Sequence, residues 1–361
     1  MTRMSCIVAF VAGILLLVIG GVLGCAAPQP APPAPAPAPA PAPPPEEVTE
    51  WKYLTVETPG SDVHGLMVDF ANQITEASGG RLKVTAYPLG ELPYTGADAA
   101  RATRDGLIQM CHISVPFVIG DIPMAPISDF PFLERTEETR KKYNEVAKPY
   151  LVAAFDNWGV EVVGTCAYGR RQLITRDPVS SLDDLKGKKI RCAGGIQPEV
   201  LRALGIVPMS ILFPEVYTAF SRGVIDGVLT ASRAHEQIKT HEPGDYFFKI
   251  DGETGAVMES INKDAWNALP QDIRDIITRL TKEFTADWDQ KVLVDWEEGA
   301  VSRMLAAPDG LKAAVEITEE DWLRCQKATL PILDDYVTKN IGPDGLAAFK
   351  EILKALNIKY Y

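Results

Sequence analysis

Two arginines carry the strongest binding chemistry that this sequence offers. Arg171 follows Tyr168-Gly169 early in a predicted strand, and Arg191 lies late in the predicted strand KKIRC. A guanidinium group is a planar fork whose parallel N–H donors match the two oxygens of a carboxylate. On adjacent parallel strands, or on a strand and its neighbouring crossover, the two side chains would converge on one small anion. The alternative is that either arginine extends its charge into solvent.

Arg191 belongs to a basic cluster in an acidic chain. The stretch LDDLKGKKIRCAGG covers residues 182–195, whereas the whole chain has a formal net charge of -12. Asp183-Asp184 precede LKG, where they are expected to start a helical turn and complement its dipole. Arg191 is interpreted as the residue that faces a binding cleft. The lysines are interpreted as solvated charges of the turn and strand edge: Lys186, Lys188 and Lys189.

The sequence contains no short motif with an established catalytic mechanism. It lacks GxxxxGK[ST], GxSxG, HExxH and an acidic loop with EF-hand spacing. The histidines form no ligand pair at helical or strand spacing: His64, His112, His235 and His241. We therefore predict a protein that is not an enzyme and that uses no metal and no cofactor.

The cysteines beyond residue 25 are scattered and form no CxxC pair. They are Cys111, Cys166, Cys192 and Cys325. A disulfide between Cys166 and Cys192 is one interpretation for an exported protein, because both lie on predicted strands. Buried free thiols are the preferred interpretation.

The N-terminus has the features of a bacterial lipoprotein signal. Residues 1–24 combine an early arginine with an apolar core, and Val22-Leu23-Gly24-Cys25 resembles a lipobox. We predict a signal peptide over residues 1–24, a lipidated Cys25, and export to the periplasm or cell exterior with a lipid anchor in the cell membrane. The alternative is an uncleaved membrane anchor, because the apolar run approaches the length of a membrane span.

A Pro/Ala-rich segment separates this signal from the rest of the chain. Residues 25–48 are predicted to form a polyproline tether, and the remaining length of about 310 residues favours two lobes. The acidic balance argues against non-specific nucleic-acid binding, which depends on clustered positive charge. Any local basic residue must therefore have a local explanation.

Strand and helix patterns alternate along most of the body. A strand over 51–56, a helix over 64–78 and a strand over 81–87 begin one series, and 160–175 begins a second. Strand–helix–strand order predicts parallel sheets covered by helices. Helical spacing continues from residue 265 to 307 with few breakers after Pro270. The expected architecture is two α/β lobes with long helices, and a ligand cleft at the ends of the strands.

Several motifs in the same order resemble the DctP-type solute-binding proteins of TRAP transporters. They are GRRQLITRDPVSSLDDLKGKKIRCAGG, ALGIVPMSILFPEVYTAFSRGVIDG, SGGRLKVTAYPLGEL, DAARATRDGLIQM, FPFL and INKDAWNALPQDIRDII. The resemblance covers nearly everything from residue 50. It implies a fold like that of periplasmic binding proteins, with two lobes that close over a carboxylate-bearing solute and a long helix that spans both lobes.

The resemblance also implies which residues bind the solute. Arg191 would form a bidentate salt bridge with the solute carboxylate, Arg171 would assist, and Phe213 would pack on the solute. Thr230 and Arg233 of the second lobe are further candidates, as are Glu57, Ser114 and Phe117 of the first lobe. Leu229-Thr230 follow the shared Asp-Gly pair, which does not match the sialic-acid subgroup or the metal-assisted keto-acid subgroup.

The resemblance finally implies domains and partners. Lobe I is expected over residues 49–167 plus about 256–295, and lobe II over 168–255 plus about 296–361. The partners would be a small organic acid and the small and large membrane subunits of a TRAP permease. The rival hypotheses are a solute-sensing lipoprotein and an enzyme on a similar two-lobe scaffold.

Overall fold

One long strand, β4 (Val160–Thr175), takes part in both halves of the sheet. In this computed structural model, which describes residues 48–360, the first half of β4 pairs with β9 (Thr254–Asn262) and the second half with β7 (Gly227–Ala231) and β8 (Tyr246–Lys249). Within the described residues the strands form a ten-stranded mixed sheet with the order β2-β1-β3-β9-β4-β7-β5-β6, and β8 pairs with β4 and β10 beside this path. The predicted signal peptide, lipidated Cys25 and tether lie outside the described residues.

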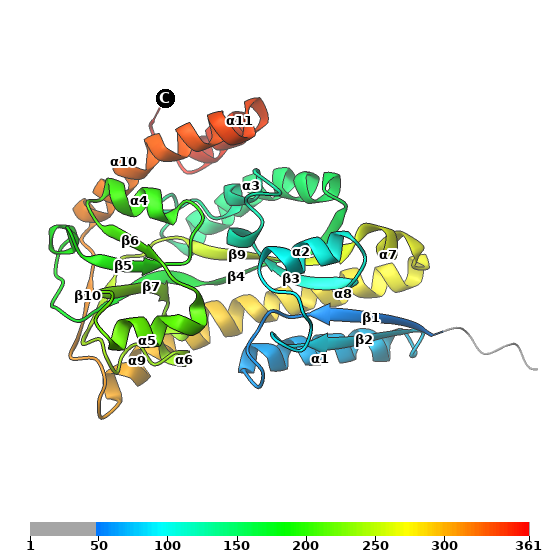
Figure 1. Cartoon of the computed structure of the whole chain (residues 1–361). Helices are drawn as coiled ribbons and strands as arrows, with labels where there is room; N and C mark the ends of the chain where they lie inside the picture. Colours follow the sequence, from blue (N-terminus) through cyan, green and yellow to red (C-terminus); the bar gives the residue numbers. More distant parts are fainter. Residues whose placement is uncertain (1–47, 361) are drawn as a thin grey trace, which may run out of the picture. The chain divides into compact units, whose positions relative to one another are not determined.

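The remaining strands and the helices lie on the two sides of β4 (Figure 1). The other strands are β1 (Thr49–Leu54), β2 (Leu82–Tyr87), β3 (Met110–Ser114), β5 (Lys189–Cys192), β6 (Val207–Ser210) and β10 (Ala313–Glu316). The α-helices are α1 (Asp62–Ala77), α2 (Ala97–Arg104), α3 (Glu137–Asn157), α4 (Gln197–Ala203), α5 (Val216–Ser221), α6 (Ser232–Gln237), α7 (Lys263–Ala268), α8 (Gln271–Trp288), α9 (Glu297–Ala306), α10 (Glu319–Tyr336) and α11 (Pro343–Ala355).

Local sequence signals explain several of these boundaries. Ser61 caps α1 by accepting a hydrogen bond from the backbone N–H of His64. Thr136 and Thr139 exchange hydrogen bonds at the start of α3, which is a capping box. The expected helical turn at Asp183-Asp184 is present as a 3₁₀ turn over Leu182–Leu185, and the Asp184 carboxylate accepts from the backbone N–H groups of Ser180 and Ser181.

Parallel pairing is confirmed inside each series of strands but not where the series join. β1 pairs in parallel with β2 and β3, and β5 pairs in parallel with β6 and β7. However, β4 is antiparallel to β7, and β9 is antiparallel to both β3 and β4. The expectation of purely parallel sheets was therefore wrong for β4 and β9. Right-handed crossovers fix the direction of strands that are linked by one helix, whereas β4 enters after the long connection from Ser114 to Val160 and β9 follows β8 after four residues without a helix.

Helices cover both faces of each half-sheet. In the first half, α1 and α8 pack on one face around Phe70 and Ile277, while α2 and α3 pack on the other face around Leu54 and Phe155. In the second half, α4 and α10 cover one face, and α5 and α9 cover the other. α3, α10 and α11 share a further apolar cluster. This layered arrangement confirms the α/β fold class, whereas the lobe boundaries stay a prediction.

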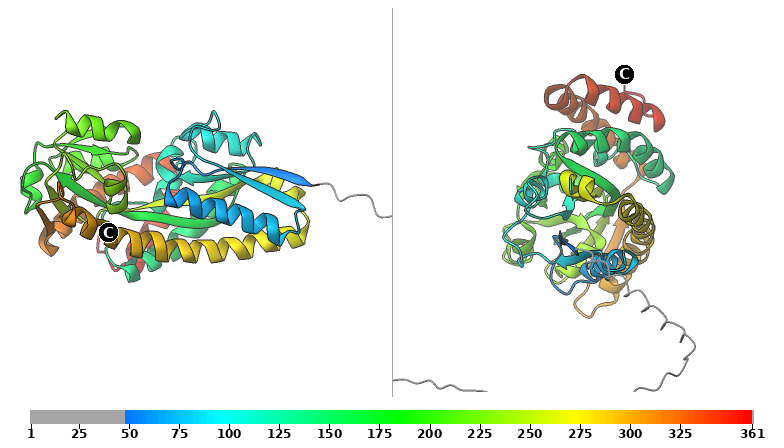
Figure 2. Two further views of the ribbon diagram at one scale, coloured as in Figure 1. Left: turned by 90° about the horizontal axis from the view of Figure 1, so that it is seen from below. Right: turned by 90° about the vertical axis from the view of Figure 1, so that its right-hand side faces the viewer.

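The predicted long helix is also present. α8 continues through a π-helical segment (Asp289–Trp296) into α9, and Figure 2 shows this run, in yellow to orange, along the sheet. Ile273 and Leu280 of α8 belong to the core of the first half-sheet. Ala300 and Met304 of α9 belong to a core of the second half-sheet. The helical run therefore buries apolar side chains against both halves.

Candidate functional site

Arg191 is a buried cation without a matching anion. It lies on β5, is 4% exposed, and its Nε donates a hydrogen bond to the carbonyl oxygen of Ile211 at 3.0 Å. Among residues 48–360, no carboxylate lies within 4.0 Å of its nitrogen atoms. Burial, followed by repulsion from Arg171, lowers the pKa of Arg191 to about 10. An anionic group placed against its fork would remove this electrostatic cost.

Arg171 differs from Arg191 because a carboxylate lies beside it. Its Nε is 3.7 Å from Oε1 of Glu253, a residue that is 4% exposed and directly precedes β9. The backbone N–H of Arg171 also donates to the carbonyl oxygen of Glu253 at 2.9 Å. A methyl group built at Gly255 would overlap the Arg171 guanidinium, so a larger residue there would displace it. The Nε of Arg171 is buried and has no hydrogen-bond partner in the described structure.

The acidic side of this pair was not predicted from the sequence. Gln197 of α4 donates a short hydrogen bond to Oε1 of Glu253, and its own Oε1 accepts from the backbone N–H of Ala193 at 2.9 Å. Asp129 lies in the field of both Glu253 and Arg171, and burial is the main reason why its pKa lies well above the usual range. Glu253 is thus held by Gln197 of α4 and Arg171 of β4, and it follows no recognisable motif itself.

The two arginines flank one strand. Arg171 of β4 pairs with Ala231 of β7, and Arg191 of β5 pairs with Val228 of the same strand. They therefore lie on the two neighbours of β7, and not on adjacent parallel strands as one of our alternatives supposed. Both arginines act on His235 of α6, whose pKa is lowered to about 3, chiefly by burial. Both charges are therefore close enough to act on the same imidazole.

Thr230 and Phe213 lie near this region of the second half-sheet. Thr230 is 3% exposed, lies on β7 and pairs across the ladder with Gln172 of β4. Phe213 is partly buried and opens the 3₁₀ turn Phe213–Glu215, two residues after Ile211, whose carbonyl oxygen holds Arg191. The same short stretch of backbone therefore carries Phe213, the predicted contact to the solute, and the carbonyl group of Ile211 that orients Arg191.

Arg233 lies at the start of α6, which α9 anchors. The carboxylate of Glu297 accepts hydrogen bonds from the backbone N–H groups of Ser232 and Arg233 at 2.7 and 3.1 Å. Gly169 of β4 makes room for it, because a methyl group at that position would overlap the Glu297 carboxyl carbon. Burial raises the pKa of Glu297. The guanidinium carbon of Arg233 lies over the ring of Trp296, 5.9 Å from its centroid.

Glu57 is the most strongly fixed of the first-lobe candidates. It is 8% exposed and accepts a short hydrogen bond from the hydroxyl group of Tyr168 on β4. Burial, followed by the charge of Glu57, raises the pKa of Tyr168, whereas Arg233 lowers it. Tyr168 is therefore affected by the charges of both Glu57, which follows β1, and Arg233 of α6.

Ser114 and Phe117 have weaker structural support. Ser114 is partly buried at the last position of β3, and no hydrogen bond of its side chain is present in the described structure. Phe117 lies in the 3₁₀ turn Val115–Phe117 with 47% of its surface exposed. Its ring packs close to Gly96. The structure therefore connects neither residue to the two arginines.

A buried polar cluster lies on the first half-sheet beside Tyr168. Glu259 of β9 accepts a hydrogen bond from the Tyr53 hydroxyl at 2.7 Å and bonds to Nδ1 of His112 at 2.5 Å. The His112 ring meets the edge of Tyr168 with centroids 5.8 Å apart and tilts against Trp288 at 5.1 Å. These contacts position the ring that holds Glu57. They support the side chain of Tyr168 and do not involve Arg171 or Arg191.

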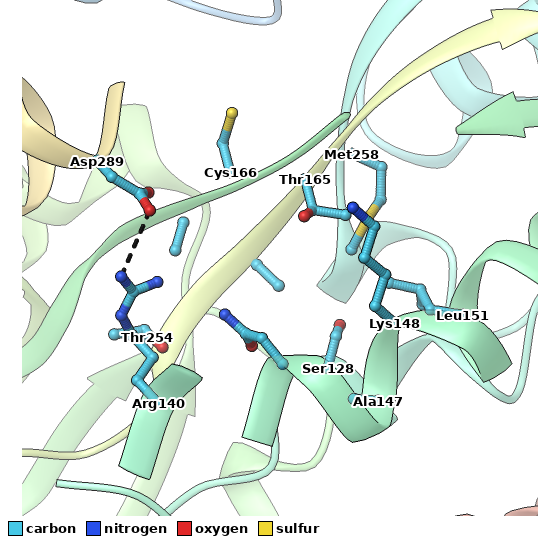
Figure 3. A pocket seen from close by; sticks show the side chains of 13 residues that line it. Ser128, Arg140, Ala147, Lys148, Leu151, Thr165, Cys166, Thr254, Met258 and Asp289 are labelled. Carbon is cyan, nitrogen blue, oxygen red and sulfur yellow. Dashed lines mark hydrogen bonds and ion pairs between the residues drawn. The ribbon is translucent and has the colours of Figure 1, made fainter. Parts of the chain in front are cut away.

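A separate pocket lies between α3 and the strands β4 and β9 (Figure 3). Its volume is about 110 Å³, and Arg140, Lys148, Thr165, Thr254 and Asp289 are among its lining residues. Arg140 donates to Glu137 at 2.9 Å and lies 3.4 Å from Asp289. Arg140 already pairs with Glu137 and Asp289, and neither Arg171 nor Arg191 lines the pocket. This pocket is therefore not the predicted carboxylate site.

Within residues 48–360, no helix combines the length and the apolarity needed to cross a membrane. The same residues contain no group of three or more His, Cys, Asp or Glu side chains arranged to hold a metal ion.

The class of protein follows from the fold and is supported by comparison with known structures. Two half-sheets that share one strand, with a long helix against both, form the architecture of two-lobe solute receptors. The chain belongs to the DctP family: the family model of bacterial extracellular solute-binding proteins, family 7, matches residues 54–340.

Individual relatives are distant. The chain is 25% identical over 288 residues to the C4-dicarboxylate-binding periplasmic protein DctP of Rhodobacter capsulatus, which covers 75% of this chain and 81% of that protein. A solute-binding protein of Sulfitobacter sp. is 27% identical over 164 residues, 45% of this chain and half of its own length. A Bordetella pertussis extracytoplasmic solute receptor binding pyroglutamic acid has a TM-score of 0.76 and 21% identity, covering 86% of this chain and 100% of that one.

Proposed function

We propose that this protein is the extracytoplasmic solute-binding component of a TRAP-type transporter and that it captures a small carboxylate-bearing solute. The observation that carries the proposal is the state of Arg191, which is buried, positively charged and without a carboxylate partner among the described residues. A buried charge is costly until it is paired. A ligand carboxylate that accepts from both Nη groups would supply the missing partner, in a cleft between the two lobes.

Closure of the lobes would strengthen this interaction. Water in an open cleft screens the charge of Arg191, and its removal on closure lowers the local dielectric constant. The solute therefore favours the closed state by its stronger binding there. The anchoring of α6 by Glu297 and the holding of Arg191 by Ile211 fix the second half-sheet before the solute arrives.

Delivery to a membrane permease completes the proposed role. The chain would be exported and held at the membrane by lipidated Cys25, with the Pro/Ala-rich tether allowing the receptor to reach the small and large permease subunits. The support is the family membership and the sequence of residues 1–48. A radiolabelled-lipid assay on the Cys25→Ala variant tests the anchor, and retention of label by this variant would contradict it.

The test of the arginine uses isothermal titration calorimetry with two probes, pyroglutamate and succinate. They represent the ligand of one structural neighbour and the C4-dicarboxylates of one relative. We expect at least one to bind the wild-type protein, Arg191→Ala to abolish binding, and Arg191→Lys to weaken it by about a hundredfold, because a point charge lacks the fork. Wild-type affinity in either variant would disprove the proposed contact.

A matched control comes from a surface arginine. Arg303 makes a two-point contact with Glu236 at 2.7 and 2.8 Å and is well exposed. Arg303→Lys makes the same chemical change outside the site, so its ligand affinity should equal that of the wild type. Mass spectrometry of the solute released from the protein should find it chemically unchanged, and turnover of that solute would instead favour an enzyme.

A further inference from the structure

The charges around the two arginines are unequal, and this inequality bears on the number of carboxylates in the solute. Arg191 has no carboxylate within 4.0 Å in the described structure, whereas Arg171 has Glu253 at 3.7 Å. Both arginines and Glu253 are strongly buried. The comparison is therefore between one cation that has a carboxylate beside it and one that does not.

Glu253 is held in place as a fixed part of the site. Gln197 donates to its Oε1, and its backbone carbonyl oxygen accepts from the N–H of Arg171 at 2.9 Å. The guanidinium of Arg171 lies against Gly255, which has no side chain to displace it. Arg171 and Glu253 lie side by side, so the solute would meet them together.

Two further charged groups, Asp129 and Arg233, act in the same region. Asp129 is buried beside Glu253 and Arg171, and its carboxyl group is held toward its neutral form by burial and by the Glu253 charge. Arg233 lies over Trp296 and in the field of Glu297, and it also acts on Tyr168, which donates to Glu57. The charge of Arg233 therefore acts on Glu297 and on Tyr168.

We propose that Glu253 selects solutes with a single carboxylate: it balances Arg171, which leaves Arg191 as the receiving cation, and it repels a second carboxylate brought to the same site. This inference rests on the proposed function, since it assumes that Arg191 holds a solute carboxylate. Like charges placed together in a desolvated interface cost several kcal/mol, so the discrimination should be large enough to measure.

Two pairs of matched compounds test the inference on the purified full-length protein. Butanoate and succinate share four carbons, and D-glucuronate and D-glucarate share six, while each pair differs by one carboxylate. Isothermal titration calorimetry should show the monocarboxylate binding at least about tenfold more tightly in any pair that binds. Tighter binding of succinate or D-glucarate would overturn the inference. A protein that binds none of the four counts against both the inference and the proposed function.

The variant Glu253→Gln removes the negative charge and keeps the shape. Its preference should shift toward the dicarboxylate by about tenfold relative to the wild type, because Arg171 becomes available. An unchanged ratio would overturn the inference. The double variant Arg171→Gln/Glu253→Gln removes the pair together, and it provides the test if the single variant does not fold. It lacks both the repelling charge of Glu253 and the second cation, so its preference for the monocarboxylate should be smaller than that of the wild type, and an unchanged ratio would contradict our inference.

The two proposals fail in different ways. If Arg191→Ala abolishes binding while the wild type prefers dicarboxylates, Arg191 holds the solute and only the role of Glu253 is wrong. If Arg191→Ala binds like the wild type, the proposed site is wrong and the inference falls with it. Circular dichroism and a thermal melt of each variant establish that the binding data come from folded protein.

Discussion

At the scale of single residues, the two arginines should have opposite effects on stability. Arg191 is an unbalanced buried cation, so Arg191→Met removes a desolvated charge and loses one hydrogen bond to Ile211. A buried ion costs several kcal/mol, whereas one such hydrogen bond contributes about 1 kcal/mol. We expect the free energy of unfolding of the ligand-free protein to rise by about 1–3 kcal/mol, measured by urea denaturation.

Arg171→Met is the matched control for this prediction. It makes the same side-chain change, but it leaves Glu253 buried without its cation. Breaking a buried pair on one side is destabilising, so we expect a loss of about 2–4 kcal/mol in the same assay. A loss of stability in both variants would show that Arg191 is balanced by a group that we have not recognised.

The two arginines also show how much of the site could be predicted from the sequence. Arg191 stands out because a strand pattern and a glycine pair surround it. Lys186 is exposed beside Asp183, as expected of a solvated charge, whereas the side chain of Lys188 is only 20% exposed and pairs with Asp177. Glu253 was missed because it lies 82 positions from Arg171 in the chain, and no local pattern joins them. Pairing between distant residues depends on topology, which single-residue reasoning does not supply.

At the scale of elements, the contact between β4 and α9 depends on one glycine. A methyl group at Gly169 would overlap Glu297, which holds the start of α6 through the N–H groups of Ser232 and Arg233. Gly169→Ala should therefore displace the Glu297 carboxylate and lower the free energy of unfolding by about 1–3 kcal/mol in urea. Because Arg233 begins α6, the affinity for the solute should fall as well.

Gly65 provides the control for that substitution. It lies inside α1, has an ordinary helical backbone, and a methyl group there meets nothing within 4 Å. Gly65→Ala should stabilise the protein by about 0.5–1 kcal/mol, since alanine favours helix more than glycine does. If Gly169→Ala were equally harmless, the carboxylate of Glu297 would have room to move and would not anchor α6.

The elements also show which signals in the sequence were informative. Helical spacing correctly indicated the long run that contains α8 and α9. β9 was not recognised, because eight of its nine residues are buried and its pattern lacks the alternation of a half-exposed strand. With β9 missing, the antiparallel join between the two series of parallel strands was not predictable either.

At the scale of the whole molecule, the reactivity of the buried thiols measures how accessible the core is to solvent. Cys111, Cys166, Cys192 and Cys325 are free and buried, so the preferred interpretation of free thiols is confirmed. Burial raises the pKa of each, that of Cys325 to about 12, which disfavours the reactive thiolate. None should react with Ellman's reagent at pH 8 in the native state, whereas all four should react in guanidinium. Fast labelling of the native protein would instead reveal an opening of the core.

The net charge of the molecule opposes the local charge of Arg191. A formal charge of -12 repels an anionic solute at long range, while the contact with Arg191 is buried. Salt screens charges that are separated by more than about 8–10 Å but weakens buried contacts much less. The association rate of an anionic solute should therefore rise by about two- to fivefold between 0.01 M and 0.15 M salt, while its dissociation rate changes little. Stopped-flow tryptophan fluorescence measures both rates. An association rate that falls with salt would mean that a local positive field, and not the net charge, governs the approach of the solute.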